Sequence, residues 1–199
     1  MAGLRRIATL MLLALASAPA PIAAQQVTDG AAAARAAVAE VGDEHLWLSK
    51  KTGQWEAQLQ LATGPGDETL QGRASVSRRM ELGGRVLAEY WNGEIGGRPF
   101  EGVRRTGYDN VSGEFWSTWT DTESTALYVS RGERVPDAGQ IELSGEYTDP
   151  VTNRRVGMEV VWTFVDVDRE IIETHEVRNG EKRRVERIVM ARVEASEAR

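Results

Sequence analysis

Apolar and polar residues alternate along most of the chain after Gly53. This two-residue period is typical of a β-strand with one buried face. In the first run, Trp55, Ala57, Leu59 and Leu61 share one side, and Gln54, Glu56, Gln58 and Gln60 share the other. The same period recurs in three further sets: Ala74, Val76 and Met80; Val86, Ala88 and Tyr90; and Val156, Met158, Val160, Trp162 and Phe164.

Turn signals separate these runs. They read "TGPGD", "LGG", "NGEIGG", "DNVSG", "TDP" and "RNG". Spacings of about 8–12 residues without a helical insert indicate antiparallel strands in a sandwich or barrel. Closure into a barrel removes the exposed edges that so many short strands would otherwise leave. We therefore predict an all-β domain over residues 43–194, a closed antiparallel barrel of about ten strands. A short helix starting near Asp43 is expected over one end.

The N-terminus has the plan of a secretory signal. Arg5 and Arg6 precede an apolar run from Ile7 to Ala18, and small residues lead to a cut after Ala24. Residues 1–24 are thus predicted to be a signal peptide, with an uncleaved anchor as the alternative. Residues 25–42 are expected to form an alanine-rich helix or linker, and residues 195–199 a disordered tail. An exported protein follows, either periplasmic or extracellular, with no membrane span after cleavage.

The charge excludes one class of partner. The chain has a net charge of −6, and cleavage after Ala24 would remove two arginines and leave −8. Because the basic residues are scattered, no positive surface for a phosphate backbone is expected, so nucleic acid is not a predicted partner. The chain has no cysteine, which excludes disulfides and acylation of a thiol.

The two histidines give little support for a metal or haem. Asn179-Gly180 predicts a type I′ hairpin in which Glu176 faces Arg183 and Thr174 faces Val185. His175 then faces Arg184 on a charged outer side that also carries Glu173 and Glu186. His45 lies in the short predicted helix. An axial haem ligand would have to point inward, and no His and carboxylate spacing resembles a zinc site. We expect no cofactor and no metal.

Several stretches resemble known proteins. "GQW" at the first strand resembles the start of lipocalin-like barrels, and "LGGRVL", "RPFEGVRRTGYDN" and "STWTD" resemble the bacterial domain-of-unknown-function family DUF1579. The resemblance extends from about His45 to Val193. It implies a calycin-like barrel, often exported, without an agreed activity or catalytic residues. It also implies that Arg192 stacks on Trp55 and closes the barrel base.

The stretch "TGYDNVSGEFWSTWTD" holds the most concentrated chemistry. Trp116 and Trp119 are three positions apart, so on a strand they point to opposite faces. Asp121 shares the side of Trp119. One interpretation is a pocket wall with a polar anchor, and the other is a buried tryptophan beside a turn-capping aspartate.

Arginines within strands suggest an anionic ligand. A guanidinium inside a barrel must meet a carboxylate or a bound anion, because an unpaired buried charge is costly. Arg78 and Arg105 are the candidates; the alternatives are an internal Arg–Glu pair or a bulge that turns them outward. Our preferred hypothesis is an interior site for a small apolar or amphipathic molecule. Its predicted residues are Trp55, Arg78, Tyr90, Arg105, Trp116, Trp119, Asp121 and Trp162.

Two other functions stay open. An enzyme could use Asp109, Asp121 or His175 in the same cavity, although no nucleophile motif supports one, and binding without catalysis is the stronger prediction. A barrel filled by its own side chains could instead serve as a protein-interaction module in the cell envelope. The sequence does not distinguish a hollow interior from a filled one.

Overall fold

The computed structural model describes residues 22–63 and 68–194, with the backbone alone for residues 22–29. Two helices precede the sheet, α1 (Ile22–Ala39) and α2 (Asp43–Ser49), and a 3-10 turn, η1 (Pro136–Ala138), lies between β6 and β7. The strands are β1 (Gly53–Ala62), β2 (Thr69–Glu81), β3 (Val86–Ile95), β4 (Arg98–Asp109), β5 (Glu114–Asp121), β6 (Tyr128–Val135), β7 (Gln140–Thr148), β8 (Arg155–Phe164), β9 (Arg169–Arg178) and β10 (Glu181–Arg192).

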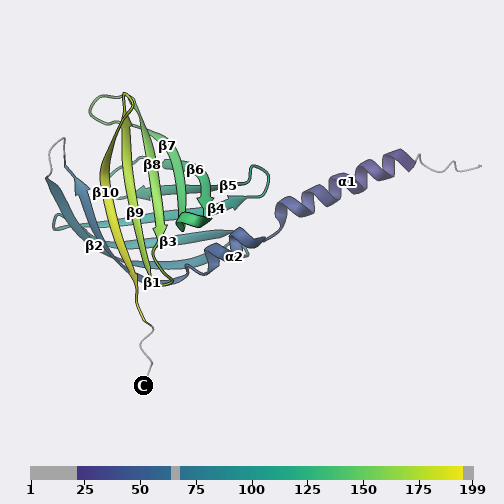
Figure 1. Cartoon of the computed structure of the whole chain (residues 1–199), viewed down its shortest axis with the longest axis horizontal. Helices are drawn as coiled ribbons and strands as arrows, with labels where there is room; N and C mark the ends of the chain where they lie inside the picture. Colours follow the sequence, from purple (N-terminus) through teal and green to yellow (C-terminus); the bar gives the residue numbers. More distant parts are fainter. Residues whose placement is uncertain (1–21, 64–67, 195–199) are drawn as a thin grey trace, which may run out of the picture. The chain divides into compact units, whose positions relative to one another are not determined.

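The ten strands form a closed antiparallel barrel (Figure 1). Each strand pairs with its neighbour in sequence, and β1 closes the ring by pairing with β10. Trp55, for example, stands opposite Val76 on β2 and Arg192 on β10. The predicted all-β class and the closed barrel of about ten strands are confirmed.

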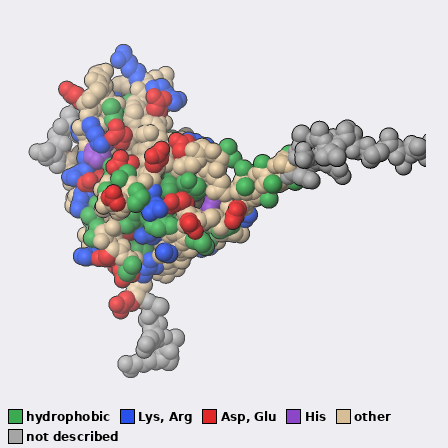
Figure 2. Space-filling model, turned by 45° about the vertical axis from the view of Figure 1, so that its right-hand side comes forward, with side chains coloured by type: hydrophobic (Ala, Val, Ile, Leu, Met, Phe, Trp, Pro, Cys, Tyr) green, Lys and Arg blue, Asp and Glu red, His purple; other side chains and the backbone are tan. Residues whose placement is uncertain are grey.

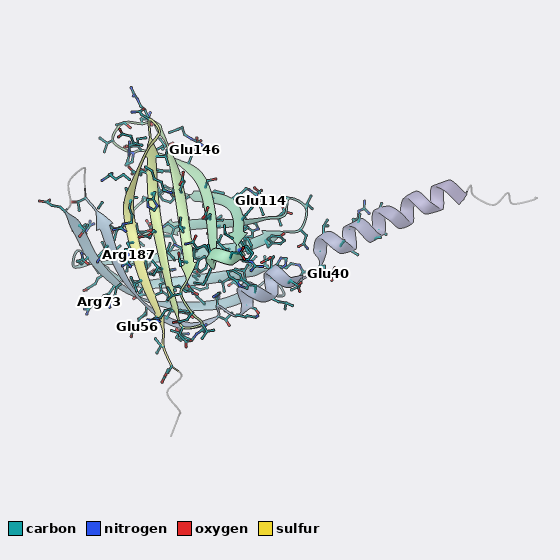
Figure 3. All side chains as sticks on the ribbon, in the orientation of Figure 1. Glu40, Glu56, Arg73, Glu114, Glu146 and Arg187 are labelled. Carbon is teal, nitrogen blue, oxygen red and sulfur yellow. The ribbon has the colours of Figure 1, made fainter. Side chains whose placement is uncertain are left out.

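Alternation holds on the first strand as the sequence predicted. Trp55, Ala57 and Leu59 are buried in the barrel core, whereas Gln54, Glu56 and Gln58 are turned away from it. Outward positions carry charges of both signs, which are spread over the visible barrel surface (Figure 2). Glu56, Arg73 and Glu146, labelled in Figure 3, are exposed residues of this kind.

Helix α2 lies at one end of the barrel, as expected from the sequence. Gly42 precedes the helix, and its N–H donates to Nδ1 of His45, which is itself buried against the edge of Tyr108. Leu48 is completely buried in the core and Trp47 packs beside it. His45 is therefore a helix-packing residue.

The same end is closed by stacked side chains. The Arg192 guanidinium lies 4.4 Å from the ring centre of Trp55 and donates to the carbonyl oxygens of Thr52 and Lys50. This is the plug that the resemblance to lipocalins implied. Trp55 Nε1 donates to Lys51 O at 3.1 Å, which ties the first strand to the segment after α2.

The β9–β10 hairpin is only partly as predicted. Glu176 faces Arg183 and His175 faces Arg184, in the register that the Asn179-Gly180 turn sets. A β-bulge at Val185 then shifts the pairing, so that Thr174 faces Glu186 and not Val185. The predicted placement of Glu186 on the charged outer side is wrong, because the extra residue turns its side chain to the interior.

The N-terminal residues form a separate unit from the barrel. Helix α1 covers most of the predicted alanine-rich segment, whereas the signal-peptide residues up to position 21 and the predicted tail 195–199 lie outside the described residues. Within the described part of the chain, neither helix has the length and apolar character needed to cross a membrane.

Candidate functional site

The half of the barrel away from α2 contains a cavity of about 390 Å³. It reaches the barrel end formed by Ala62 of β1, Arg98 of β4 and Tyr147 of β7. Most of its wall is apolar, and the apolar residues are Leu59, Leu61, Leu70, Ile95, Phe100, Leu143, Met158, Val160 and Ile188. The interior is thus packed at the α2 end and hollow at the other.

Charged residues form the floor between the packed and hollow halves. Arg78, Glu89 and Glu170 are completely buried at their side chains. Arg78 Nη1 donates to Glu170 Oε2 at 2.7 Å, and Arg78 Nε lies 3.6 Å from Glu89 Oε1. The Arg78 guanidinium also lies between the rings of Trp55 and Trp162, at 4.6 and 5.3 Å from their centres.

Indole N–H groups complete this floor. Trp91 Nε1 donates to Glu89 Oε2 at 3.2 Å, and Trp162 Nε1 donates to Glu170 Oε2 at 3.0 Å. Lys51 Nζ lies 3.7 Å from the second oxygen of Glu170, and burial lowers the pKa of the Lys51 ammonium. Each buried carboxylate therefore faces more than one donor, as burial of charge requires.

Arg104 is the cation that faces the cavity. Its side chain is 11% exposed, and its Nη1 lies 3.9 Å from Glu89 Oε2. The rings of Trp91, Trp119 and Trp162 surround the guanidinium, with centres 5.3 to 5.9 Å away.

No residue that the structure describes accepts a hydrogen bond from Arg104, although its guanidinium carries five N–H donors. Glu89 is shared with Arg78 and Trp91, so it compensates Arg104 only in part. The floor of the cavity therefore also includes an arginine with unused N–H donors. We call the three rings around it, those of Trp91, Trp119 and Trp162, the tryptophan cage.

Asp121 lies beside Trp119 on the cavity wall, and its oxygens are fully occupied. Trp119 Nε1 donates to Asp121 Oδ2 at 2.6 Å, while the N–H groups of Glu123 and Ser124 donate to Oδ1 at 3.0 and 3.1 Å. This geometry agrees with the second interpretation drawn from the sequence, in which Asp121 caps a turn beside a tryptophan. Asp121 fixes the indole of Trp119 and the chain after β5.

Polar side chains at the mouth are mostly paired with one another. Arg98 Nη2 donates to Glu123 Oε2 at 2.6 Å. The Tyr147 hydroxyl donates to Glu176, and burial together with this carboxylate raises the pKa of Tyr147. Glu176 also accepts a hydrogen bond from Arg178 at 2.8 Å.

The eight residues predicted for the site are divided among three places. Trp119, Asp121 and Trp162 line the cavity. Trp55 and Arg78 are interior but lie in the packed half, where Arg78 has the internal Arg–Glu pair that was one alternative. On the outer face lie Tyr90, Arg105 and Trp116.

Sequence reasoning misplaced Tyr90 and Arg105 because the inward positions next to them on β3 and β4 include charged residues and a glycine, which hide the interior phase. Glu89 and Trp91 point inward, so Tyr90 between them points out and donates to Glu81 at 2.6 Å. On β4, Gly102 and Arg104 take the inward positions; Arg105 is 48% exposed and lies 3.8 Å from Glu81.

Trp116 and Trp119 do point to opposite faces. Trp116 lies over Gly107, where an added Cβ atom would be 2.4 Å from Trp116 Cζ2. Trp119 lies over Gly102 inside the barrel in the same way.

Sequence reasoning missed Arg104, Glu89 and Glu170. The signal that could have found Glu89 and Arg104 is their register: the two stand opposite each other on β3 and β4, and Glu89 also faces Arg78 on β2. A row of opposite charges across three neighbouring strands predicts a cross-strand ion-pair network. Glu170 lacks this signal because it reaches Arg78 across the barrel interior, from β9 to β2.

The predicted catalytic groups do not converge. Asp109 faces Glu114 and Asp121 faces Gly102, so the two aspartates lie at opposite ends of the β4–β5 ladder. His175 faces Glu159 and Arg184 on neighbouring strands, away from the cavity lining. Among the described residues, no three His, Cys, Asp or Glu side chains are grouped as a metal site would need.

The fold and cavity define a class of protein: a closed, up-and-down antiparallel barrel of calycin type with a partly apolar cavity at one end. A model of the protein family of unknown function DUF1579 matches residues 40–192. The chain therefore belongs to the DUF1579 family, as the motifs in its sequence indicated. No curated protein has a matching sequence.

Proposed function

We propose that this barrel binds a small amphipathic anion, with the acidic group on Arg104 and the apolar part along the cavity wall. The observation that carries the proposal is the state of Arg104: a nearly buried guanidinium that has aromatic neighbours on three sides but no hydrogen-bond acceptor among the described residues. A bound carboxylate or phosphate would supply the acceptor that it lacks.

The size and lining of the cavity support the same ligand class. Small-molecule sites are about 300–1,000 Å³, mostly apolar, with a few polar groups that set orientation. The cavity of about 390 Å³ lies at the lower end of this range. Its leucine, isoleucine and valine side chains would bury an alkyl or small ring body, at roughly 25 cal/mol per Å² of apolar surface.

We also propose that the chain is exported, from the signal-like pattern of residues 1–24. Sequencing the N-terminus of the protein isolated from its own cells tests this; a chain that keeps Met1 and stays with the cytoplasm would contradict it. In the envelope or outside it, a binding barrel would act as a carrier or scavenger of the anion.

The test of ligand binding uses lauric acid as the probe. Isothermal titration and tryptophan emission are measured for the natural protein, Arg104→Gln and Arg105→Gln. Adjacent positions on β4 make the two variants a matched pair, since each loses one positive charge but only Arg104 faces the cavity. We expect Arg104→Gln to weaken binding by about 10- to 100-fold, because hydrogen bonds to charged groups contribute roughly 1.5–3 kcal/mol.

Arg105→Gln should bind lauric acid like the natural protein. Equal binding by the natural protein and Arg104→Gln would contradict the proposed role of Arg104, and a complete lack of binding across fatty acids and other amphipathic anions would contradict the function itself. Thermal unfolding of both variants shows whether either change has altered the fold.

A further inference from the structure

The charged groups that line the cavity are almost all balanced within the protein. Arg98 is paired with Glu123 at the mouth, and Glu176 with Arg178. The Asp121 carboxylate is stabilised by three neutral N–H groups, which occupy both of its oxygens. These groups therefore have little capacity left for a ligand.

Two lining groups, Arg104 and Glu186, are less completely matched: Arg104 shares Glu89 with other donors, and Glu186 accepts one hydrogen bond from a neutral hydroxyl. The one hydrogen bond to Glu186 comes from the Thr174 hydroxyl, which donates to Oε2 at 2.7 Å. Within the described ranges, no lysine, arginine or histidine forms an ion pair with this carboxylate. No described residue donates a hydrogen bond to its second oxygen.

The bulge at Val185 is what brings Glu186 inside. Regular pairing from the hairpin turn would place this residue opposite Glu173, on the outer face; the extra residue places it opposite Thr174 instead. There it is surrounded by the apolar side chains of Leu61 and Ile188, which also line the cavity.

An apolar ligand that covered Glu186 would strip water from a charge without supplying a partner. Such desolvation of an ionised carboxylate is costly unless a cation or strong donor replaces the water. A ligand with an ammonium or similar N–H group at that place would avoid the cost and gain a charge-assisted hydrogen bond.

We infer that the ligand is bifunctional, with an acidic group bound by Arg104 and a cationic, N–H-donating group bound by Glu186 and Thr174. The two anchors are on β4 and β10, with β3, β2 and β1 between them on the shorter way around the wall. The acidic and cationic groups must then be at separate ends of an apolar body, as in an ω-amino fatty acid. This inference rests on the proposed function for its acidic end.

The experiment compares lauric acid with ω-aminolauric acid, and octanoic acid with ω-aminooctanoic acid as a shorter pair. Dissociation constants are measured by titration for the natural protein, Glu186→Gln, Arg104→Gln and Glu146→Gln. Glu146 is the control because its loss removes the same charge from the outer face, where Glu146 is paired with Arg155 (Figure 3).

In Glu186→Gln we expect the ω-amino probe of the better-fitting length to bind about tenfold more weakly than in the natural protein, while the plain fatty acid binds equally well or more tightly. Glu146→Gln should change neither. A change of equal size for both probes, or no change for either ω-amino probe, would identify Glu186 as a solvated mouth residue and overturn the inference.

The failure of the inference and that of the proposed function give different results. If lauric acid binds and depends on Arg104 but the amino group has no effect, the amine site is wrong and the anion site stands. If no probe binds, or if Arg104→Gln binds all of them as the natural protein does, both are wrong.

Discussion

The Glu89 carboxylate of the protein itself competes with any anion that binds to Arg104. Its Oε2 lies 3.9 Å from Arg104 Nη1, at the boundary between the packed and hollow halves. We expect Glu89→Gln to tighten lauric acid binding by roughly three- to tenfold, because the change removes a negative charge beside the site and frees the guanidinium. Titration with lauric acid measures the effect.

The same substitution should make the protein less stable. The introduced amide oxygen can still accept from Trp91, and Arg78 keeps Glu170 at 2.7 Å, but one charge of the buried network is lost. We expect a cost of about 3 kcal/mol in the free energy of unfolding, at the low end of values for broken buried pairs. Glu94→Gln, an exposed change on the same strand, is the control. Unaltered or weaker binding in Glu89→Gln would show that the carboxylate does not compete.

For individual residues of the candidate site, the sequence predicted the residue types better than it predicted their positions. An arginine anchor in an interior lined by tryptophans was predicted at Arg78 or Arg105, but in the structure Arg104, the neighbour of Arg105, faces the cavity. The reason is physical. Phe100 and Tyr108 mark the inward phase of β4 near its two ends, but the inward positions close to the two arginines are Gly102, Arg104 itself and Thr106, which show no apolar period. Only the ion pairing with β3 distinguishes the two arginines.

Two glycines in the β4–β5 hairpin make room for the two tryptophans of β5. A Cβ atom at Gly102 would lie 2.3 Å from Trp119 Cη2, and one at Gly107 would lie 2.4 Å from Trp116 Cζ2. Real side chains do not approach so closely, so alanine at either position must displace a ring. Each change should lower the free energy of unfolding by roughly 1–3 kcal/mol.

Only one of these changes should affect binding. Gly102→Ala moves Trp119, which flanks Arg104, and we expect roughly three- to tenfold weaker binding of lauric acid. Gly107→Ala moves Trp116 on the outer face and should leave the dissociation constant unchanged. Denaturant unfolding and titration of both variants give the comparison; equal losses of affinity would mean that the tryptophan cage has no specific part in binding.

Strands and turns were predicted correctly where the neighbouring residues alone determine them. The alternation in β1 and the Asn179-Gly180 turn determine a strand and a hairpin without reference to the rest of the chain. The bulge at Val185 was not predictable in this way. It arises because the turn would place Ile188 and Met190 on the outer face, and burial of these two side chains requires the opposite phase.

The stability of the whole barrel should fall in acid. Asp109, Asp149 and Asp166 each accept a backbone N–H two residues ahead, from Val111, Val151 and Asp168 at 2.7–2.9 Å. These backbone N–H groups lower the pKa of each carboxyl in the folded protein. Their contribution is complete above the unfolded pKa of about 4 and is lost as the pH falls through the lower folded pKa.

The substitution Asp149→Asn distinguishes the effect of the negative charge from that of the turn hydrogen bond. The asparagine oxygen can still accept from Val151, but the ion pair with Arg178, 2.7 Å in the natural protein, is removed. We expect lower stability at neutral pH and a shallower loss between about pH 5 and pH 2. Urea unfolding over this range measures both; parallel curves for the two proteins would contradict the link to the Asp149 charge.

Closure of the barrel could be predicted from the sequence, but its cavity could not. The strand spacing is compatible with a sandwich or a barrel, and a closed wall is favoured because it leaves no exposed strand edges. Whether the lumen is hollow depends on how side chains from strands far apart fill it, as when Glu170 of β9 meets Arg78 of β2. Such contacts follow from the barrel geometry and leave no local pattern.

The bulge on β10 also determines which side chains of this strand face the cavity. If the extra residue moved from Val185 to Arg187, the turn and the pairing of Ile188 with Ile172 would be kept, while Glu186 would come to face Glu173 outside. Val185, which already lines the cavity next to Glu186, would then take the position opposite Thr174. Relocating one irregularity by two residues would thus take the Glu186 carboxylate out of the lumen and leave the Arg104 guanidinium there, without any substitution.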